Sequence, residues 1–139
     1  MRTERYLLDT CAIIWLTNKM TISDEVSDLL RTIPPGSGRL SVSAISAWEI
    51  GLLVTRGRLP TTKHALSWFD DFLEAVDVMV RETSTKILVA SSYLPQPIHN
   101  DPADRILIAT AREYDLTIIT RDRAILSYGA AGHVRTLEC

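Results

Sequence analysis

Short apolar runs alternate along the chain with longer segments in which apolar residues recur every three or four positions. The short runs predict β-strands at residues 6–8, 39–42, 76–80 and 117–120, with a final edge strand at 133–137. The longer segments predict helices at about residues 10–17, 23–33, 43–56, 62–75, 84–93 and 102–114. This alternation predicts an α/β fold with a largely parallel central sheet of four or five strands flanked by helices, because parallel strands need a crossover connection.

The length and composition are those of one globular domain. A chain of 139 residues leaves no room for a second independent core, so we expect a single domain over residues 1–139. The apolar content of 46% and the charged content of 23% exclude intrinsic disorder. No apolar stretch reaches the ~20 residues of a membrane span, and the N-terminal segment lacks the apolar core of a signal peptide. We therefore expect no membrane association.

The two cysteines of the chain, Cys11 and Cys139, lie at opposite ends of the sequence. Neither belongs to a C-x-x-C pair or to a Cys/His spacing typical of zinc ligands. A disulfide framework is therefore not indicated, and the sequence is compatible with a reducing cytoplasm.

Four acidic residues occupy positions from which they could share one site. Asp9 follows the first predicted strand and Asp122 follows the strand at 117–120. Ligands of open α/β sheets bind outside the carboxyl ends of the strands, which is where these two acids fall. Glu49 and Asp104 lie on predicted helices, in stripes otherwise formed by apolar residues. A carboxylate that faces a core is costly unless it is hydrogen-bonded, paired or bound to a cation.

Taken singly, each acid also has a structural explanation. Helix capping is the alternative role for three acids, Asp9, Asp101 and Asp122. Glu49 could instead pair with a base such as Arg56, and Asp104 could interact with the dipole of its own helix. These roles do not explain why acids from distant segments all fall at strand ends or on inward-facing stripes.

A single divalent-cation site accounts for all four acids. Carboxylates with few histidines suit Mg²⁺ or Mn²⁺ better than zinc, and such sites hydrolyse phosphate esters by activating water. Without the four acids the formal net charge changes from −2 to +2, so a pI near 5.9 does not exclude a nucleic-acid substrate. Several arginines beside these acids could contact phosphates, or could simply form a solvated surface: Arg105, Arg112, Arg121 and Arg123.

Four segments of the sequence resemble the signatures of PIN-domain ribonucleases, and most closely those of VapC-type toxins of bacterial toxin-antitoxin pairs. They are residues 7–16, 42–50, 99–109 and 119–122, which together span nearly the whole chain in the family's order. The resemblance implies a PIN-like three-layer sandwich. It also implies a Mg²⁺- or Mn²⁺-dependent endoribonuclease that cuts RNA, commonly a tRNA or ribosomal RNA. A homodimer and a small VapB-like antitoxin are the partners that the resemblance implies.

Carried over residue by residue, the resemblance places the family's acidic quartet on Asp9, Glu49, Asp104 and Asp122, as catalytic residues and metal ligands. Asp101 matches an additional acid of the D-P-x-D-R variant. Thr10 and Thr120 match hydroxyl positions that orient a ligand or water, while Ser43 and Ser46 are weaker matches. Arg105, Arg121 and Arg123 are the candidates for contact with RNA.

The sequence departs from the family at two positions, since a histidine is usual at Cys11 and a bulky aromatic residue at Ala103. Neither change removes a ligand. His99, just before a predicted helix, is more typical of a turn or supporting residue than of a ligand. The aromatic stripe of Trp68, Phe69 and Phe72 could bind a partner, although ordinary core packing explains it better.

Two other functions compete with the nuclease. A PIN-like binding module without catalysis would be expected to lack one of the four acids, and here all four are present. A Mg²⁺-dependent phosphatase would need a second Asp two positions after Asp9, where the chain has Cys11, and a receiver domain would need an acidic pair before it. A phosphoaspartate on Asp9 would favour this second alternative.

Overall fold

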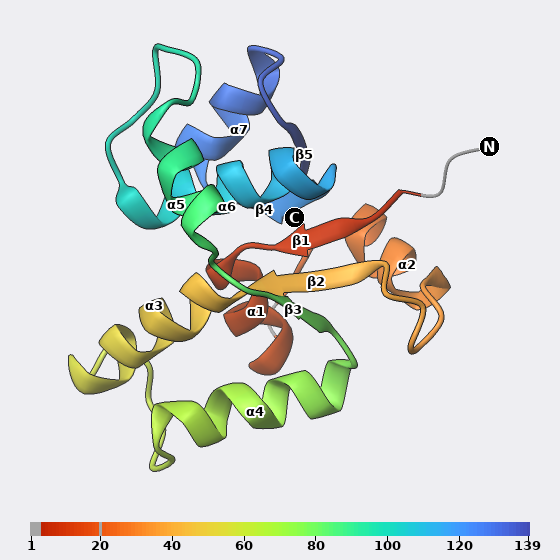
Figure 1. Ribbon diagram of the computed structural model, residues 1–139. Helices are drawn as coiled ribbons and strands as arrows, with labels where there is room; N and C mark the ends of the chain where they lie inside the picture. Colours follow the sequence, from red (N-terminus) through yellow and green to blue (C-terminus); the bar gives the residue numbers. More distant parts are fainter. Residues whose placement is uncertain (1–3, 20) are drawn as a thin grey trace.

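The centre of the molecule is one five-stranded sheet in which every pair of neighbouring strands is parallel. The computed structural model describes residues 4–19 and 21–139, so the first three residues of the N-terminal segment discussed above lie outside the described part. The strand order is β3-β2-β1-β4-β5 (Figure 1). The strands are β1 (Tyr6–Leu8), β2 (Leu40–Ser43), β3 (Met79–Arg81), β4 (Thr117–Thr120) and β5 (Arg135–Glu138).

Helices cover both faces of this sheet, which confirms the predicted three-layer α/β architecture (Figure 1). One face carries α1 (Thr10–Thr17), α2 (Asp24–Thr32), α3 (Ala44–Thr55) and α4 (Ala65–Val76). The other face carries α5 (Thr85–Ser92), α6 (Pro102–Tyr114) and α7 (Arg123–Ala130). Among the described residues, no helix combines the length and the apolar character needed to cross a membrane.

Alternating side chains of the central strands fill the two cores. Leu7 of β1 and Ile118 of β4 belong to the core beneath α5, α6 and α7, whereas Leu8 and Ile119 belong to the core on the other face. All four side chains are fully buried, as expected for strands covered by helices on both faces. The aromatic stripe Trp68, Phe69 and Phe72 lies in the second of these cores, which supports core packing for these residues.

The structure differs from the predicted elements chiefly at α7, β3 and β5. The predicted helices end at residue 114, and only the capping role considered for Asp122 indicates a further helix; α7 runs from Arg123 to Ala130 and buries Ile125 and Tyr128. The strand expected at 76–80 begins later, because α4 continues to Val76 and ends at Asp77 in a left-handed conformation, with φ 56°. The last strand likewise starts two residues later than expected.

The strand order has its topological switch point at β1, where strands are added first on one side and later on the other. From β1 the chain moves first to β2 on one side, and later to β4 on the other. In open parallel sheets, the crevice at such a switch point is the usual ligand site, at the carboxyl ends of the strands. The residues that follow β1 and β4 therefore occupy the position where a functional site is expected.

Candidate active site

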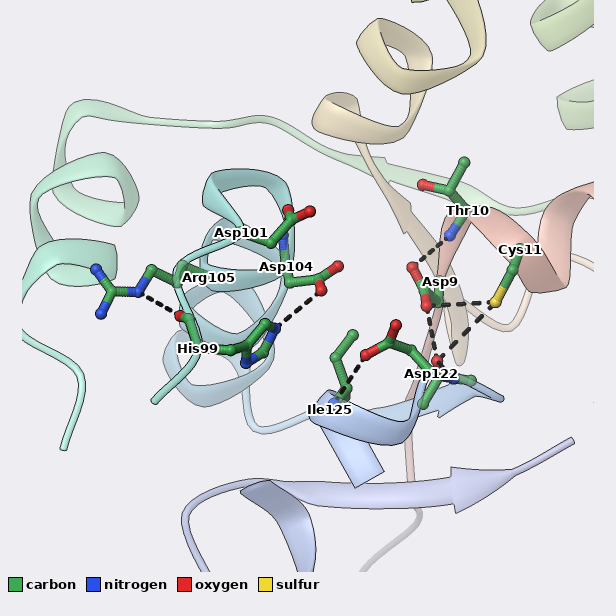
Figure 2. Close-up of polar contacts among 10 residues, drawn as sticks. Asp9, Thr10, Cys11, His99, Asp101, Asp104, Arg105, Asp122 and Ile125 are labelled. Carbon is green, nitrogen blue, oxygen red and sulfur yellow. Dashed lines mark hydrogen bonds and ion pairs between the residues drawn. The ribbon is translucent and has the colours of Figure 1, made fainter. Parts of the chain in front are cut away.

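Asp9 stands at the carboxyl end of β1 and is held by three donors. Its side chain is buried, and the residue is only 5% exposed. Oδ1 accepts from the backbone N–H of Thr10 at 2.7 Å, which makes Asp9 the N-cap of α1. Oδ2 accepts from the hydroxyl of Thr120 at 2.6 Å and from the thiol of Cys11 at 3.3 Å (Figure 2). The capping role and a role in a site are thus compatible for this residue.

Thr120 connects the ends of the two central strands. While its hydroxyl donates to Asp9, the same oxygen accepts the backbone N–H of Asp122 at 2.9 Å. Asp122 in turn caps α7, because its Oδ2 accepts from the backbone N–H of Ile125 at 2.9 Å. One buried hydroxyl therefore fixes the relative position of two acids that lie far apart in the sequence.

Glu49 approaches from α3 and is held by a second threonine. The hydroxyl of Thr10 donates to Oε1 of Glu49 at 2.5 Å and lies 2.9 Å from the hydroxyl of Ser46. Ser43, the weaker match, accepts the backbone N–H of Ile45 as the N-cap of α3. The hydroxyl of each of the two threonines thus donates to one carboxylate of the predicted quartet.

The acids at the start of α6 face the same space from the helical layer on the opposite face of the sheet. Asp101 is the N-cap of α6, as its position before Pro102 suggests, and accepts the backbone N–H of Asp104 at 3.0 Å. The side chain of Asp104 is 16% exposed, and its Oδ2 lies 2.9 Å from Nε2 of His99. Figure 2 shows Asp104 and Asp122 projecting toward Asp9 from the starts of their two helices.

All five acids line one cleft of about 430 Å³. They come from four segments that are distant in the sequence and are Asp9, Glu49, Asp101, Asp104 and Asp122. The cleft also has an apolar side formed by Ile14, Trp15 and Leu53. The juxtaposition expected from strand ends and helix faces is therefore present in the structure.

Burial, with a smaller contribution from neighbouring acids, raises the pKa values of Asp9, Glu49 and Asp104. For Asp9 and Glu49 burial is the main cause, and neighbouring acids contribute in the same direction, while donated hydrogen bonds oppose both effects. Burial, together with the charges of Asp101, Asp122 and Asp9, raises the pKa of Asp104 to about 7, against an opposing hydrogen bond from His99. Without a compensating positive charge, the ionised cleft is electrostatically unfavourable.

The donor set fits a hard divalent cation. Ligand atoms of His99, Asp104 and Asp122 all lie within 4.8 Å of one another. Asp9 and Glu49 face the same cleft and add carboxylate oxygens to this group. A set dominated by carboxylates suits Mg²⁺ or Mn²⁺, and a cation there would relieve the like-charge repulsion.

The comparison with known proteins agrees with this geometry. Residues 6–130 match the family described as the PIN domain. The chain belongs to the PIN-domain family. Among curated relatives, it is 32% identical over 89 residues to Ribonuclease VapC22 of Mycobacterium tuberculosis, a match that covers 64% of this chain and 67% of that protein.

Several solved structures with the same fold come from toxin-antitoxin complexes. This PIN domain superposes on a chain of the DNA-bound VapBC complex of Salmonella typhimurium with a TM-score of 0.68, at 15% identity and over 98% of both chains. A chain of VapBC2 from Rickettsia felis, bound to a promoter DNA fragment, gives 0.65 at 17% identity, over 96% of this chain and 97% of that one. At these identities the similarity supports the fold alone. The predicted family and fold are thereby confirmed.

The arginines proposed for RNA contact differ in how they are held in this PIN domain. Nε of Arg105 donates to the carbonyl of His99 at 3.0 Å. Arg121 lines the cleft, and its guanidinium carbon lies 3.8 Å from the ring centroid of Trp15. The side chain of Arg123 is 84% exposed. The first two are thus bound into the fold, and contact with RNA stays a prediction for all three.

Cys11 and His99 lie beside the acids, but the sequence alone does not assign either of them a role in the site. Burial, followed by the negative charge of Asp9, raises the pKa of Cys11 to about 12, so the thiol is a poor nucleophile. His99 is in direct contact with Asp104. Its position outside any predicted helix gave no periodic signal, so sequence reasoning did not include it among the site residues.

We expect Thr120→Val to weaken cation binding by the PIN domain about tenfold or more, since supporting hydrogen bonds typically have such effects on metal sites. Valine keeps the volume but removes the hydroxyl that holds both Asp9 and Asp122. Titration with Mn²⁺, followed by electron paramagnetic resonance, measures the affinity. Thr120→Ser, which keeps the hydroxyl, is the control, and equal affinities for the two variants would contradict the role of this hydrogen bond.

Proposed function

We propose that this PIN domain is the endoribonuclease toxin of a VapBC-type toxin-antitoxin pair, dependent on Mg²⁺ or Mn²⁺. It hydrolyses phosphodiester bonds of RNA, with tRNA or ribosomal RNA as the expected substrate. The observation that carries the proposal is the convergence of five acids from four distant segments on one cleft. The similarity to Ribonuclease VapC22 supports the choice of RNA.

The proposed catalytic residues and metal ligands are Asp9, Glu49, Asp104 and Asp122. A bound cation would supply an activated water and would offset the charge that develops on the leaving oxygen. Thr120 orients Asp9 through its hydroxyl, and Thr10 orients Glu49 in the same way. These fixed hydrogen bonds hold the carboxylates in place before substrate arrives, so little reorganisation is needed during the reaction.

Three further properties belong to this proposal. The whole of residues 1–139 is expected to act as one PIN domain, since one sheet joins strands from both ends of the chain. A VapB-like antitoxin and a second copy of the chain are the expected protein partners, by analogy with the VapBC complexes that share this fold. The cytoplasm is the expected location, in keeping with two unpaired cysteines.

The deciding experiment is to sequence the 5′ ends of RNA fragments produced by the purified protein and by its Asp9→Asn variant. We expect defined new ends with the wild type in Mg²⁺ or Mn²⁺, and none with EDTA or with the variant. Wild-type protein that produces no ends from total RNA would contradict the proposal. A phosphoaspartate trapped on Asp9 would instead favour a phosphatase-like or receiver-like protein.

A further inference from the structure

A second groove, of about 350 Å³, lies beside the acidic cleft. One side is formed by the segment that precedes α6, and the other by α7 and the turn after it. The side chains on which the argument depends are His99, Ala124, Ser127, Tyr128, Ala131 and His133. None of these residues belongs to the proposed acidic quartet, so the groove is a feature that the proposed chemistry does not explain.

His99 connects this groove with the acids. Its ring lines the groove, while its Nε2 lies 2.9 Å from Oδ2 of Asp104. A ligand atom of His99 also lies within 4.8 Å of the carboxylates of Asp104 and Asp122. Figure 2 shows the imidazole next to Asp104, on the side away from Asp9. A nucleotide attached to a phosphate at the acids would therefore reach the groove directly.

The charge of the groove differs from that of its surroundings. No carboxylate is present among its lining residues, whereas five line the acidic cleft. A larger hollow of about 940 Å³, which includes the first residues of β1 and β4, contains Glu4, Glu25 and Asp115. Of these three hollows, the groove is thus the one that an anionic chain can follow without meeting acids.

Two arginines add positive charge close to the groove. Burial raises the pKa of Tyr128, and the charges of Arg112 and Arg105 act on it in the opposite direction. Arg112 also donates a hydrogen bond to the carbonyl of His133, and Arg105 donates to the carbonyl of His99. A guanidinium group therefore bonds the backbone on each side of the groove, and this positive charge favours a nearby phosphate.

The wall of the groove suits a planar ring. The partly exposed ring of His133 forms this wall, and the buried ring of Tyr128, which is 4% exposed, packs against it with centroids 4.7 Å apart and an inclination of 34°. The hydroxyl of Tyr128 is anchored by a 2.7 Å hydrogen bond to the carbonyl of Pro95. Ala124 and Ser127 are small side chains of α7, so the space in front of the wall stays open. Proteins commonly bind unpaired bases by stacking them on such aromatic side chains.

We propose that this groove is a nucleotide subsite, in which the base next to the scissile phosphate packs against the ring of His133, which the buried ring of Tyr128 supports from the core. The inference rests on the proposed ribonuclease function and adds to it the surface that selects the base beside the cleavage point. A single-stranded RNA segment is the ligand to which the proposal commits, because bases in a duplex are already stacked and paired.

The test fills the groove without touching the acids. Ser127→Leu puts a bulky side chain on the groove face of α7, and Ala130→Leu puts the same side chain on an exposed position of that helix outside the groove. Both are made in an Asp9→Asn background so that RNA remains intact. Binding of fluorescein-labelled single-stranded 12-mer RNA of random sequence is measured by anisotropy. We expect Ser127→Leu to weaken binding about tenfold, as for loss of one stacked base, and Ala130→Leu to leave it unchanged.

Two further measurements separate this inference from the function on which it rests. With an otherwise wild-type sequence, Ser127→Leu should change the bases found beside the mapped 5′ ends, while the increase in Tm caused by Mn²⁺ stays as in the wild type. Equal RNA affinity and equal cleavage positions for Ser127→Leu and Ala130→Leu would overturn the subsite. Absence of cleavage by the wild type would contradict the ribonuclease proposal instead, and the binding comparison would still test the groove.

Discussion

Asp104→Asn is expected to reduce RNA cleavage by about a thousandfold. The substitution keeps the shape of the side chain and removes the negative charge that we propose holds the cation. Losing several kcal/mol of charge stabilisation corresponds to a loss of this size, since each 1.36 kcal/mol changes a rate tenfold. The fold should persist, because the amide can still contact His99 and remains at the third residue of α6. The measurement is kcat/KM on an RNA that the wild type cuts.

The matched control for this variant is Asp28→Asn. Asp28 lies on α2, is largely exposed and pairs only with Arg31 at 3.5 Å among the ion pairs of the described residues. It makes the same chemical change outside the cleft, so its kcat/KM should equal that of the wild type. Circular dichroism and Tm values show whether each variant is folded. A folded Asp104→Asn protein with wild-type kcat/KM would remove Asp104 from the catalytic residues.

The metal-free protein should lose stability between pH 6 and pH 8, and Mn²⁺ should restore it at pH 8. The folded pKa of Asp104, about 7, is above the ordinary value of 3.8. Such a group stabilises the fold fully below the unfolded pKa, and this contribution is lost as the pH rises through the folded pKa. Asp9 and Glu49 have pKa values raised in the same direction.

Stabilisation by a bound cation has the opposite pH dependence, because the carboxylate ligands must be ionised and bind the cation more strongly at high pH. A cation at a hundred times its Kd adds about 2.7 kcal/mol, or roughly 10 °C in Tm for a domain of this size. Thermal unfolding in EDTA and in Mn²⁺ at several pH values measures both effects. Asp104→Asn should flatten the pH dependence in EDTA, and Asp28→Asn should not. A metal-free Tm that rises from pH 6 to pH 8 would contradict the raised pKa values.

The order of strands and helices was accessible from the sequence because the cores are large and regular. Apolar runs such as Thr117–Thr120 and the amphipathic segment Pro102–Tyr114 carry clear periodic signals, and both elements have the predicted bounds. The helix α7 was underestimated because its eight residues include Ser127 and Gly129, which are weak helix formers. Its stability comes instead from burial of Ile125 and Tyr128 against the sheet.

The acids of the site could also be found from the sequence, because strand ends and helix faces constrain where a side chain points. The partners that support them could be found only in part. Thr120 and Thr10 were suggested by family resemblance, but their individual bonds to Asp9 and Glu49 depend on packing between distant elements. The groove proposed as a nucleotide subsite had no sequence signal, since small residues of α7 and a loop histidine do not indicate a site until the fold brings them together.

The hydrogen bond from Thr120 to Asp9 spans 111 residues of the sequence. A ribosome must therefore translate most of this chain before the hydroxyl and the carboxylate can meet. Until β4 has left the exit tunnel and paired with β1, Asp9 lacks both the hydrogen bond from Thr120 and the neighbouring Asp122. The strand order thus provides a delay during translation, in which the proposed catalytic centre is still incomplete.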